Sequence, residues 1–160
     1  MFALSILAAF LLNADFELDE RGTSNSPTNS YASVIYDGLS ASKGGKQGVK
    51  VALHAYKDSF WVSMTIGFGD RTVTFGGARY VRMPHVPGVR HHVVCFFGGD
   101  HAYFIEVDGV RHDFETAEAG DVMFDRSVKP TEGVAAKGRA QPFGGRLYGV
   151  TFAELPSSKV

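Results

Sequence analysis

Residues 102–114 read AYFIEVDGVRHDF, and they decide the fold class of this chain. Two runs of strand-forming residues flank the dipeptide Asp108-Gly109, which is favoured in two-residue hairpin turns of type I′. This turn sets Glu106 opposite Arg111 on the outward face of the two strands. The sequence therefore predicts a β-hairpin with an apolar inward face and an outward ion pair between Glu106 and Arg111.

Alternation of apolar and polar residues, which marks a strand with one buried face, is clearest in residues 60–68. Every even position there is apolar, while Trp61, Ser63 and Thr65 occupy the other face. We therefore predict a strand that packs its even positions into a core and turns Trp61 away from it.

Further strands are predicted before and after this one. Residues 49–55 repeat the alternation, as do Val81 and Met83, and residues 92–97 are apolar on both faces, as in a central strand. Clusters of turn-forming residues separate these runs, and helical periodicity is nearly absent. About a dozen short strands at this spacing predict an all-β, two-sheet antiparallel sandwich.

The composition fits one globular domain. The chain has 160 residues, 44% of them hydrophobic and 21% charged, and this length can bury a core. We assign residues 1–156 to a single β-sandwich domain, residues 131–142 to a polar loop inside it, and residues 157–160 to a frayed tail. The net charge of −1 gives no general attraction to nucleic acid or anionic lipid, so neither is expected as a partner.

The apolar residues 1–14, MFALSILAAFLLNA, have two interpretations. They are too short for a bilayer span, so no membrane span is expected. They are similar to the apolar region of a signal peptide cleaved before Asp15, although no Lys or Arg precedes that region. Alternatively they form a buried first strand that continues into residues 15–18, and residues 4–12 are then paired or packed on the sandwich.

The cysteine and the histidines carry little functional signal. Cys95 is the only cysteine and lies among valines and phenylalanines, which predicts a buried apolar role rather than a reactive thiol. His91 and His92 are two of six histidines, but neighbours on a strand point to opposite faces and cannot share a metal ion.

Several segments, taken in order, resemble laminin-G-like, concanavalin A-like domains. Residues 91–99, HHVVCFFGG, followed by residues 103–110 are similar to the family signature HHV … DGG … YVDGV, and residues 143–150 are similar to its closing strand. Residues 16–25 and 46–53 resemble its early strands. Val89-Arg90 stands where the family usually has a tryptophan, and the closing strand lacks the usual acidic residue.

The resemblance implies a jelly roll of two antiparallel sheets, one of them concave. It also implies recognition of carbohydrate or protein more often than catalysis, although fold does not fix function. In the closing strand Leu147 and Val150 are three residues apart, so both can face the core only across a bulge. Gly149 is well suited to supply that bulge.

No catalytic centre can be recognised in the sequence. Glycosidase chemistry needs two carboxylates that flank the scissile bond, and residues 17–20, ELDE, are similar to the catalytic strand of jelly-roll glucanases. The spacing differs, because Arg21-Gly22 stands where the second glutamate could be. No Ser–His–Asp arrangement or phosphate-binding loop is present either. We therefore expect a protein that is not an enzyme.

Calcium is a candidate cofactor, and no other cofactor is expected. Proteins of the resembled type often hold Ca²⁺ at a sheet rim, and Asp19, Thr23 and Asn25 offer oxygen ligands for it. Asp70 and Asp100 in other loops are alternatives. Turn-forming chemistry explains all of these residues equally well.

A sugar site needs an aromatic platform beside hydrogen-bonding side chains. Trp61 is the only tryptophan, and its neighbours Ser63 and Thr65 share its face of the strand. Tyr80 with Arg82 is a second candidate. Alternatively, Trp61 covers a small second core beneath a loop.

Three functional hypotheses remain open. The first is a non-enzymatic recognition module that binds carbohydrate or another surface ligand. The second is a structural subunit of a virion or other assembly, such as a phage head decoration, fibre or spike protein, with further copies of the chain or capsid and tail proteins as partners. A glycoside-active enzyme comes third. The first two place the chain at an extracellular or virion surface.

Overall fold

A computed structural model describes residues 7–19, 31–40, 46–56, 58–77, 80–98, 102–115, 122–133 and 143–156. Within these residues the chain forms strands and no helix. The strands are β1 (Leu7–Leu18), β2 (Tyr31–Asp37), β3 (Gln47–Tyr56), β4 (Ser59–Phe68), β5 (Thr72–Gly76), β6 (Met83–Pro84), β7 (Arg90–Phe97), β8 (Ala102–Val107), β9 (Val110–Glu115), β10 (Thr131–Glu132) and β11 (Gly145–Pro156). The described part of the chain thus offers no helix long and apolar enough to cross a membrane.

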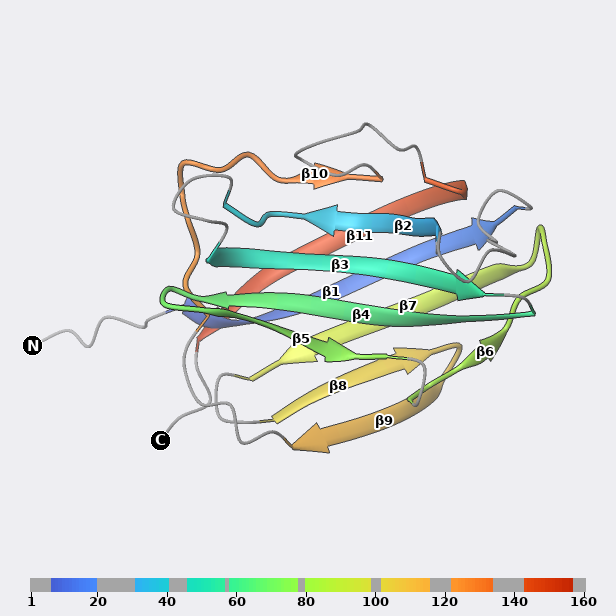
Figure 1. Ribbon diagram of the computed structural model, residues 1–160, viewed down its shortest axis with the longest axis horizontal. Coiled ribbons are helices and arrows are strands. Elements are labelled where there is room, and N and C mark those ends of the chain that lie inside the picture. Colours follow the sequence, from blue (N-terminus) through green and yellow to red (C-terminus); the bar gives the residue numbers. More distant parts are fainter. Residues whose placement is uncertain are drawn as a thin grey trace, which may run out of the picture.

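The strands pair into two antiparallel sheets that face each other (Figure 1), which confirms the predicted two-sheet jelly-roll sandwich. Sheet A has the order β11-β1-β7-β8-β9. Sheet B has the order β10-β2-β3-β4-β5, with β6 paired to β4 where β5 has ended. The two sheets therefore form two layers around one core.

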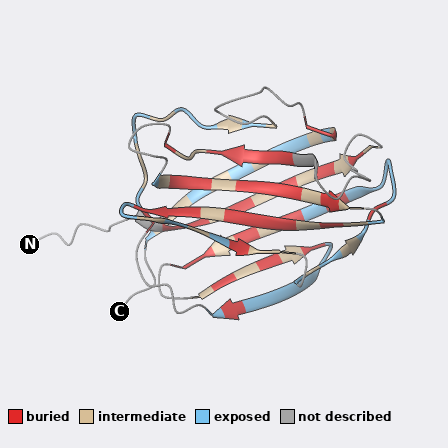
Figure 2. Ribbon diagram, in the orientation of Figure 1, coloured by how far each residue is buried: buried red, intermediate tan, exposed pale blue. Residues whose placement is uncertain are grey.

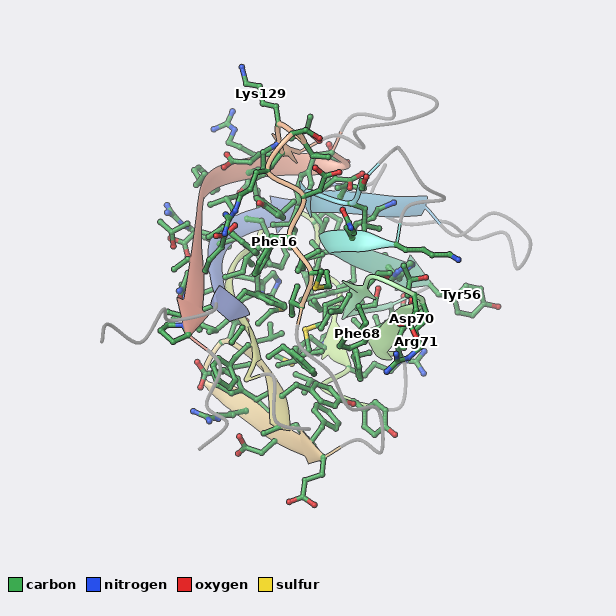
Figure 3. All side chains as sticks on the ribbon, turned by 90° about the vertical axis from the view of Figure 1, so that its left-hand side faces the viewer. Phe16, Tyr56, Phe68, Asp70, Arg71 and Lys129 are labelled. Atoms are coloured by element: carbon green, nitrogen blue, oxygen red, sulfur yellow. The ribbon has the colours of Figure 1, made fainter. Side chains whose placement is uncertain are left out.

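The core lies between the sheets and is filled by alternate residues of each strand. The even positions of β4 are buried, as the alternation predicts, and so are the even positions of β1 from Phe10 onward. The odd positions of β7, and those of β3 from Val49 onward, are buried as well. Figure 2 shows this alternation along the central strands, whereas β9 is mostly exposed. Phe16 lies in the interior when the sandwich is viewed end-on (Figure 3).

Strand β1 occupies the centre of sheet A, between β11 and β7. Its inward side chains are buried, and those of Phe10 and Leu12 have no solvent exposure. In the structure Leu7–Leu18 forms a paired first strand, whose inward face is buried from Phe10 onward, and residues 4–6 lie outside the described residues. Cleavage before Asp15 would remove the first eight residues of this strand's twelve (Leu7 to Ala14).

The hairpin of β8 and β9 has the predicted turn. Asp108 and Gly109 have φ angles of 50° and 82°, as a type I′ turn requires, and Glu106 lies opposite Arg111. The predicted ion pair is wrong, however, because Arg111 donates to Asp113 Oδ1 from Nε and Nη2 at 3.0 and 2.9 Å. The guanidinium packs on the ring of Phe104, which stands opposite Asp113, and this packing carries it away from Glu106.

Strand β11 contains the predicted bulge, but its additional residue is Tyr148 rather than Gly149. Asp15 of β1 pairs with Gly149, but Phe16 pairs with Leu147, so Tyr148 is the additional residue. The bulge allows both Leu147 and Val150 to pack against the core.

Two segments differ from their predicted form. Val81 is not in a strand: its φ is 38°, and β6 begins only at Met83. Both side chains pack against the core, which explains the apolar alternation without a strand. The predicted polar loop of residues 131–142 starts with β10, which pairs with β2. Its residues 134–142 and the tail 157–160 lie outside the described residues.

Candidate functional site

The outer face of sheet B carries the predicted binding residues of β4. Trp61, Ser63 and Thr65 all point away from the core, opposite the buried even positions of the strand. Trp61 is half-buried, so it is neither a core residue nor a free surface ring. The structure therefore confirms the predicted orientation of Trp61.

A row of three side chains, which we call the Trp61 row, crosses this face. His54 of β3 pairs in register with Trp61, and Arg82 continues the register of β6 on the other side of β4. The imidazole of His54 is nearly parallel to the indole, with ring centroids 6.1 Å apart and an interplanar angle of 17°. The Arg82 guanidinium carbon lies 5.6 Å from the indole centroid. Because β3 and β6 flank β4 on opposite sides, the indole stands between an imidazole and a guanidinium.

Hydrogen bonds fix the polar groups around this row. Arg82 Nε donates to Ser59 Oγ at 2.7 Å, and His54 Nε2 lies 2.9 Å from Ser63 Oγ. Further along β4, the hydroxyls of Thr65 and Thr74 are 3.0 Å apart. The face thus presents one aromatic ring among hydroxyl, imidazole and guanidinium groups that are already oriented.

The charge state of His54 depends on its surroundings. Partial burial lowers its pKa from the ordinary value of 6.5, and the positive charge of Lys50 on the same strand lowers it further. The neutral form of His54 is therefore favoured at pH 7, in which one ring nitrogen donates a hydrogen bond and the other accepts one. Sequence reasoning missed His54, Lys50 and Tyr56, although each follows from the register of β3 opposite β4. Tyr56 projects outward from the end of β3 (Figure 3).

Tyr80 does not join this cluster. Its ring packs against Phe114 and His112 of β9, with centroids 4.6 and 6.0 Å away. The left-handed backbone at Val81 turns the chain between Tyr80 and Arg82. Tyr80 and Arg82 are two residues apart in the sequence, but Tyr80 packs against β9 and Arg82 lies beside Trp61.

A hollow of about 400 Å³ lies on the outer face of sheet A. Its aromatic wall consists of Phe96 and Phe104, stacked with centroids 5.1 Å apart. The Arg111 guanidinium carbon lies 3.7 Å from the Phe104 centroid. The predicted hairpin register already turned Phe104 outward, but the stack with Phe96 needed the pairing of β7 with β8.

The histidine pair behaves as strand geometry predicts. His91 is buried against Phe60 and Phe16, whereas His92 is exposed on the outer face of sheet A. His92 Nδ1 lies 2.6 Å from Asp15 Oδ1, and this hydrogen bond is the main cause that lowers the pKa of Asp15. The two imidazoles cannot share an ion.

Metal sites are not evident among the described residues, where no group of three His, Cys, Asp or Glu side chains could hold an ion. His85 is buried, and its Nε2 has no hydrogen-bond partner in the described part of the chain. Burial is the main cause that lowers its pKa. Of the calcium candidates, Asp19 donates its backbone N–H to Gly144, while Thr23 and Asn25 lie outside the described residues, so calcium stays a prediction.

The fold has relatives among solved structures. A tailspike protein 2 enzymatically active domain of bacteriophage CBA120 aligns with a TM-score of 0.62 and 12% identity. The domains LG4-5 of the mouse laminin α1 chain align with a TM-score of 0.57 and 12% identity. Each alignment covers 93% of this chain. The chain has the laminin-G-like, concanavalin A-like jelly-roll fold.

The likeness is one of fold. The chain spans 22% of the tailspike chain and 36% of the laminin chain. No family model and no curated protein matches the sequence. These neighbours include both a chain described as an enzymatically active domain and domains of laminin, so the function has to be argued from the site.

Proposed function

We propose that this laminin-G-like domain is a non-enzymatic recognition module that binds carbohydrate on the outer face of sheet B. The observation that carries the proposal is the position of Trp61, the only tryptophan, half-buried on the face that the core does not use. A buried structural role would have placed it among the even positions of β4.

The chemistry of the Trp61 row suits a sugar. Sugar rings offer weakly polar C–H faces together with hydroxyl groups, so aromatic surface and fixed hydrogen-bonding groups bind them together. The indole supplies the aromatic surface, and Arg82, His54 and Ser63 supply the hydrogen-bonding groups. Because His54 and Arg82 flank the indole, a ligand meets a surface of three groups rather than a bare ring face.

A glycoside-active enzyme at this face has less support. Glycoside hydrolysis needs a pair of carboxylates beside the scissile bond. Strands β3, β4, β5 and β6 contain no Asp or Glu, and the ELDE segment belongs to sheet A and the residues that follow β1. We therefore favour binding without chemistry, at an extracellular or virion surface, with a surface glycan or glycoprotein as the partner.

A glycan array followed by titration of the strongest ligand tests the proposal. We expect Trp61→Ala to weaken binding by about 1–3 kcal/mol, that is, roughly 5- to 150-fold. Tyr148→Ala is the matched control, because Tyr148 is an exposed aromatic residue of sheet A, and it should leave binding unchanged. The melting temperature of each variant is measured on the same sample.

Three results would contradict the proposal. An array without any bound glycan would favour the structural-subunit hypothesis, in which the chain contacts other subunits. Binding that survives Trp61→Ala would move the site to another face. A large fall in melting temperature for Trp61→Ala would mean that the indole acts as core.

A further inference from the structure

The carboxylates of the strands are distributed unevenly between the two sheets. Six lie on strands of sheet A: Asp15, Glu17, Glu106, Asp113, Glu115 and Glu154. Two lie on sheet B, Asp37 on β2 and Glu132 on β10, at the edge of the sheet remote from β4. The strands that carry the Trp61 row and their neighbour β5 have none.

Arg82 has no carboxylate partner among the described residues. Four other described arginines each pair with a carboxylate: Arg71 with Asp70, Arg90 with Asp15, Arg111 with Asp113 and Arg126 with Glu154. Arg82 instead donates to the neutral hydroxyl of Ser59 and lies over the indole. Its remaining N–H groups are available to a ligand.

Lys50 adds a second positive charge to the same face. It lies four residues before His54 on β3, which is about 13 Å along the strand, and its charge is felt there because it lowers the pKa of His54. Among nearby carboxylates, Asp37 stands opposite Lys50 in β2, Asp58 lies in the turn before β4, and Asp70 is paired with Arg71. Arg82 pairs with none of them, so the guanidinium beside Trp61 has no carboxylate partner among the described residues.

We propose that the glycan bound at the Trp61 row is acidic, an oligosaccharide whose carboxylate or sulfate groups bind Arg82 and, further along, Lys50. This inference rests on the proposed function, since it names the ligand class of the same site. A planar guanidinium forms paired hydrogen bonds with a carboxylate or sulfate, and it is already held in place by Ser59. The separation of Arg82 from Lys50 calls for more than one sugar residue.

The probes are oligogalacturonides, their methyl esters, and chondroitin with and without sulfate. Within each pair the backbone is the same and the charge differs. We expect the oligogalacturonide to bind at least about tenfold more tightly than its ester, with an affinity that falls as salt rises. If sulfate is the preferred group, sulfated chondroitin should bind more tightly than the unsulfated chain. If carboxylate is preferred, the two chondroitin chains should bind equally, because both carry uronate.

The decisive variants are Arg82→Gln and Lys50→Gln, with Arg146→Gln as the matched control. Arg146 is an exposed arginine of sheet A that, like Arg82, has no carboxylate partner among the described residues. Arg82→Gln should weaken binding of the acidic probe about tenfold and reduce its salt dependence, whereas Arg82→Lys should restore part of the affinity. Arg146→Gln should change neither.

Each outcome decides a separate point. Equal binding of acidic and neutral probes, still lost in Trp61→Ala, would overturn the acidic ligand and leave the carbohydrate module standing. Equal losses of affinity for the acidic probe in Arg82→Gln and Arg146→Gln would mean that the probe responds only to the overall positive charge of the protein, and would overturn the assigned site. Absence of binding to every glycan, acidic or neutral, would overturn the proposed function itself.

Discussion

Asp108 performs two tasks in the hairpin. Its backbone adopts the left-handed conformation of the turn, and its carboxylate joins the turn to the neighbouring strand β7. Oδ2 lies 2.5 Å from Nδ1 of the buried His91, and Oδ1 accepts the backbone N–H of His92 at 2.8 Å. The Asp-Gly turn was predicted from local sequence alone. Its carboxylate also makes a contact with another strand, because it is the hydrogen-bond partner of the buried His91 imidazole, and a buried polar group without a partner is destabilising.

Gly109→Val should destabilise the protein by about 1–2 kcal/mol. The φ of 82° is costly for a β-branched residue, and an added Cβ would meet no atom within 4 Å, so the penalty comes from the backbone alone. Gly149→Ala is the control, because Gly149 also has open space around it but no positive φ. Urea unfolding of both variants measures the difference, and equal stability of the two would contradict a type I′ turn.

His54 should make stability depend on pH. Its pKa is lowered in the folded state, so below the ordinary value of 6.5 the unfolded chain binds more protons there than the folded chain does. The contribution of His54 is complete above pH 6.5 and is lost as the pH falls from 6.5 to the lowered folded-state pKa. The free energy of unfolding of the wild type should therefore fall relative to that of His54→Gln as the pH is lowered from roughly 7 to roughly 5. A constant difference between the two free energies would contradict the lowered pKa.

Among the elements, β1 is the most informative because its pairing was the open question at the N-terminus. It contacts β11 and β7 along most of its length, so the sandwich depends on it. Phe10 is fully buried and stacks on Phe152 with ring centroids 5.4 Å apart. Leu11, its neighbour, points to the outer face and is partly exposed.

Phe10→Ala should therefore cost about 3–5 kcal/mol, and Leu11→Ala clearly less. Chemical unfolding measures both free energies. Deletion of residues 1–13 should lower the melting temperature more than either substitution does. Mass spectrometry of natively produced protein checks the alternative: a chain that begins at Asp15 would show a cleaved signal segment, and the two substitutions would then be silent in the mature protein.

Local patterns predicted the elements that depend on local chemistry. Alternation identified β3, β4 and the inward face of β8, and the spacing of Leu147 and Val150 identified the bulge of β11. The Trp61 row could be predicted only in part. His54 and Arg82 come from β3 and from the segment before β6, and their approach depends on which strands pair with β4. Sheet order is a long-range property that alternation does not encode.

Val81 illustrates the opposite error. Its alternation with Met83 looks like a strand, yet the backbone turns at Val81 and only Met83 lies in a strand, although both side chains pack against the core. Apolar alternation shows which side chains face the core, but it does not show whether the backbone that carries them is extended. The same turn separates Tyr80 from Arg82, so the sequence joined two candidate residues that the fold keeps apart.

At the scale of the whole molecule, the two sheets share one core and differ on their outer faces. Aromatic contacts join the layers: Phe97 of sheet A meets Phe68 and Phe75 of sheet B, with ring centroids 5.8 and 5.5 Å apart. Such packing makes cooperative unfolding of both sheets the expected behaviour. Cys95 lies within this core on β7, in register with Leu12 and Ile105, and has no solvent exposure.

The thiol of Cys95 should therefore report on global unfolding. Burial raises its pKa to about 12, so almost no reactive thiolate exists at neutral pH, and reagents cannot reach the sulfur in the folded sandwich. In native buffer we expect no labelling by a thiol reagent over hours. In rising urea the labelled fraction should follow the loss of β-sheet circular dichroism, because the sulfur becomes accessible only when sheets A and B separate. Rapid labelling without urea would mean that β7 opens locally, and the shared core would then be less cooperative than the packing of its aromatic rings indicates.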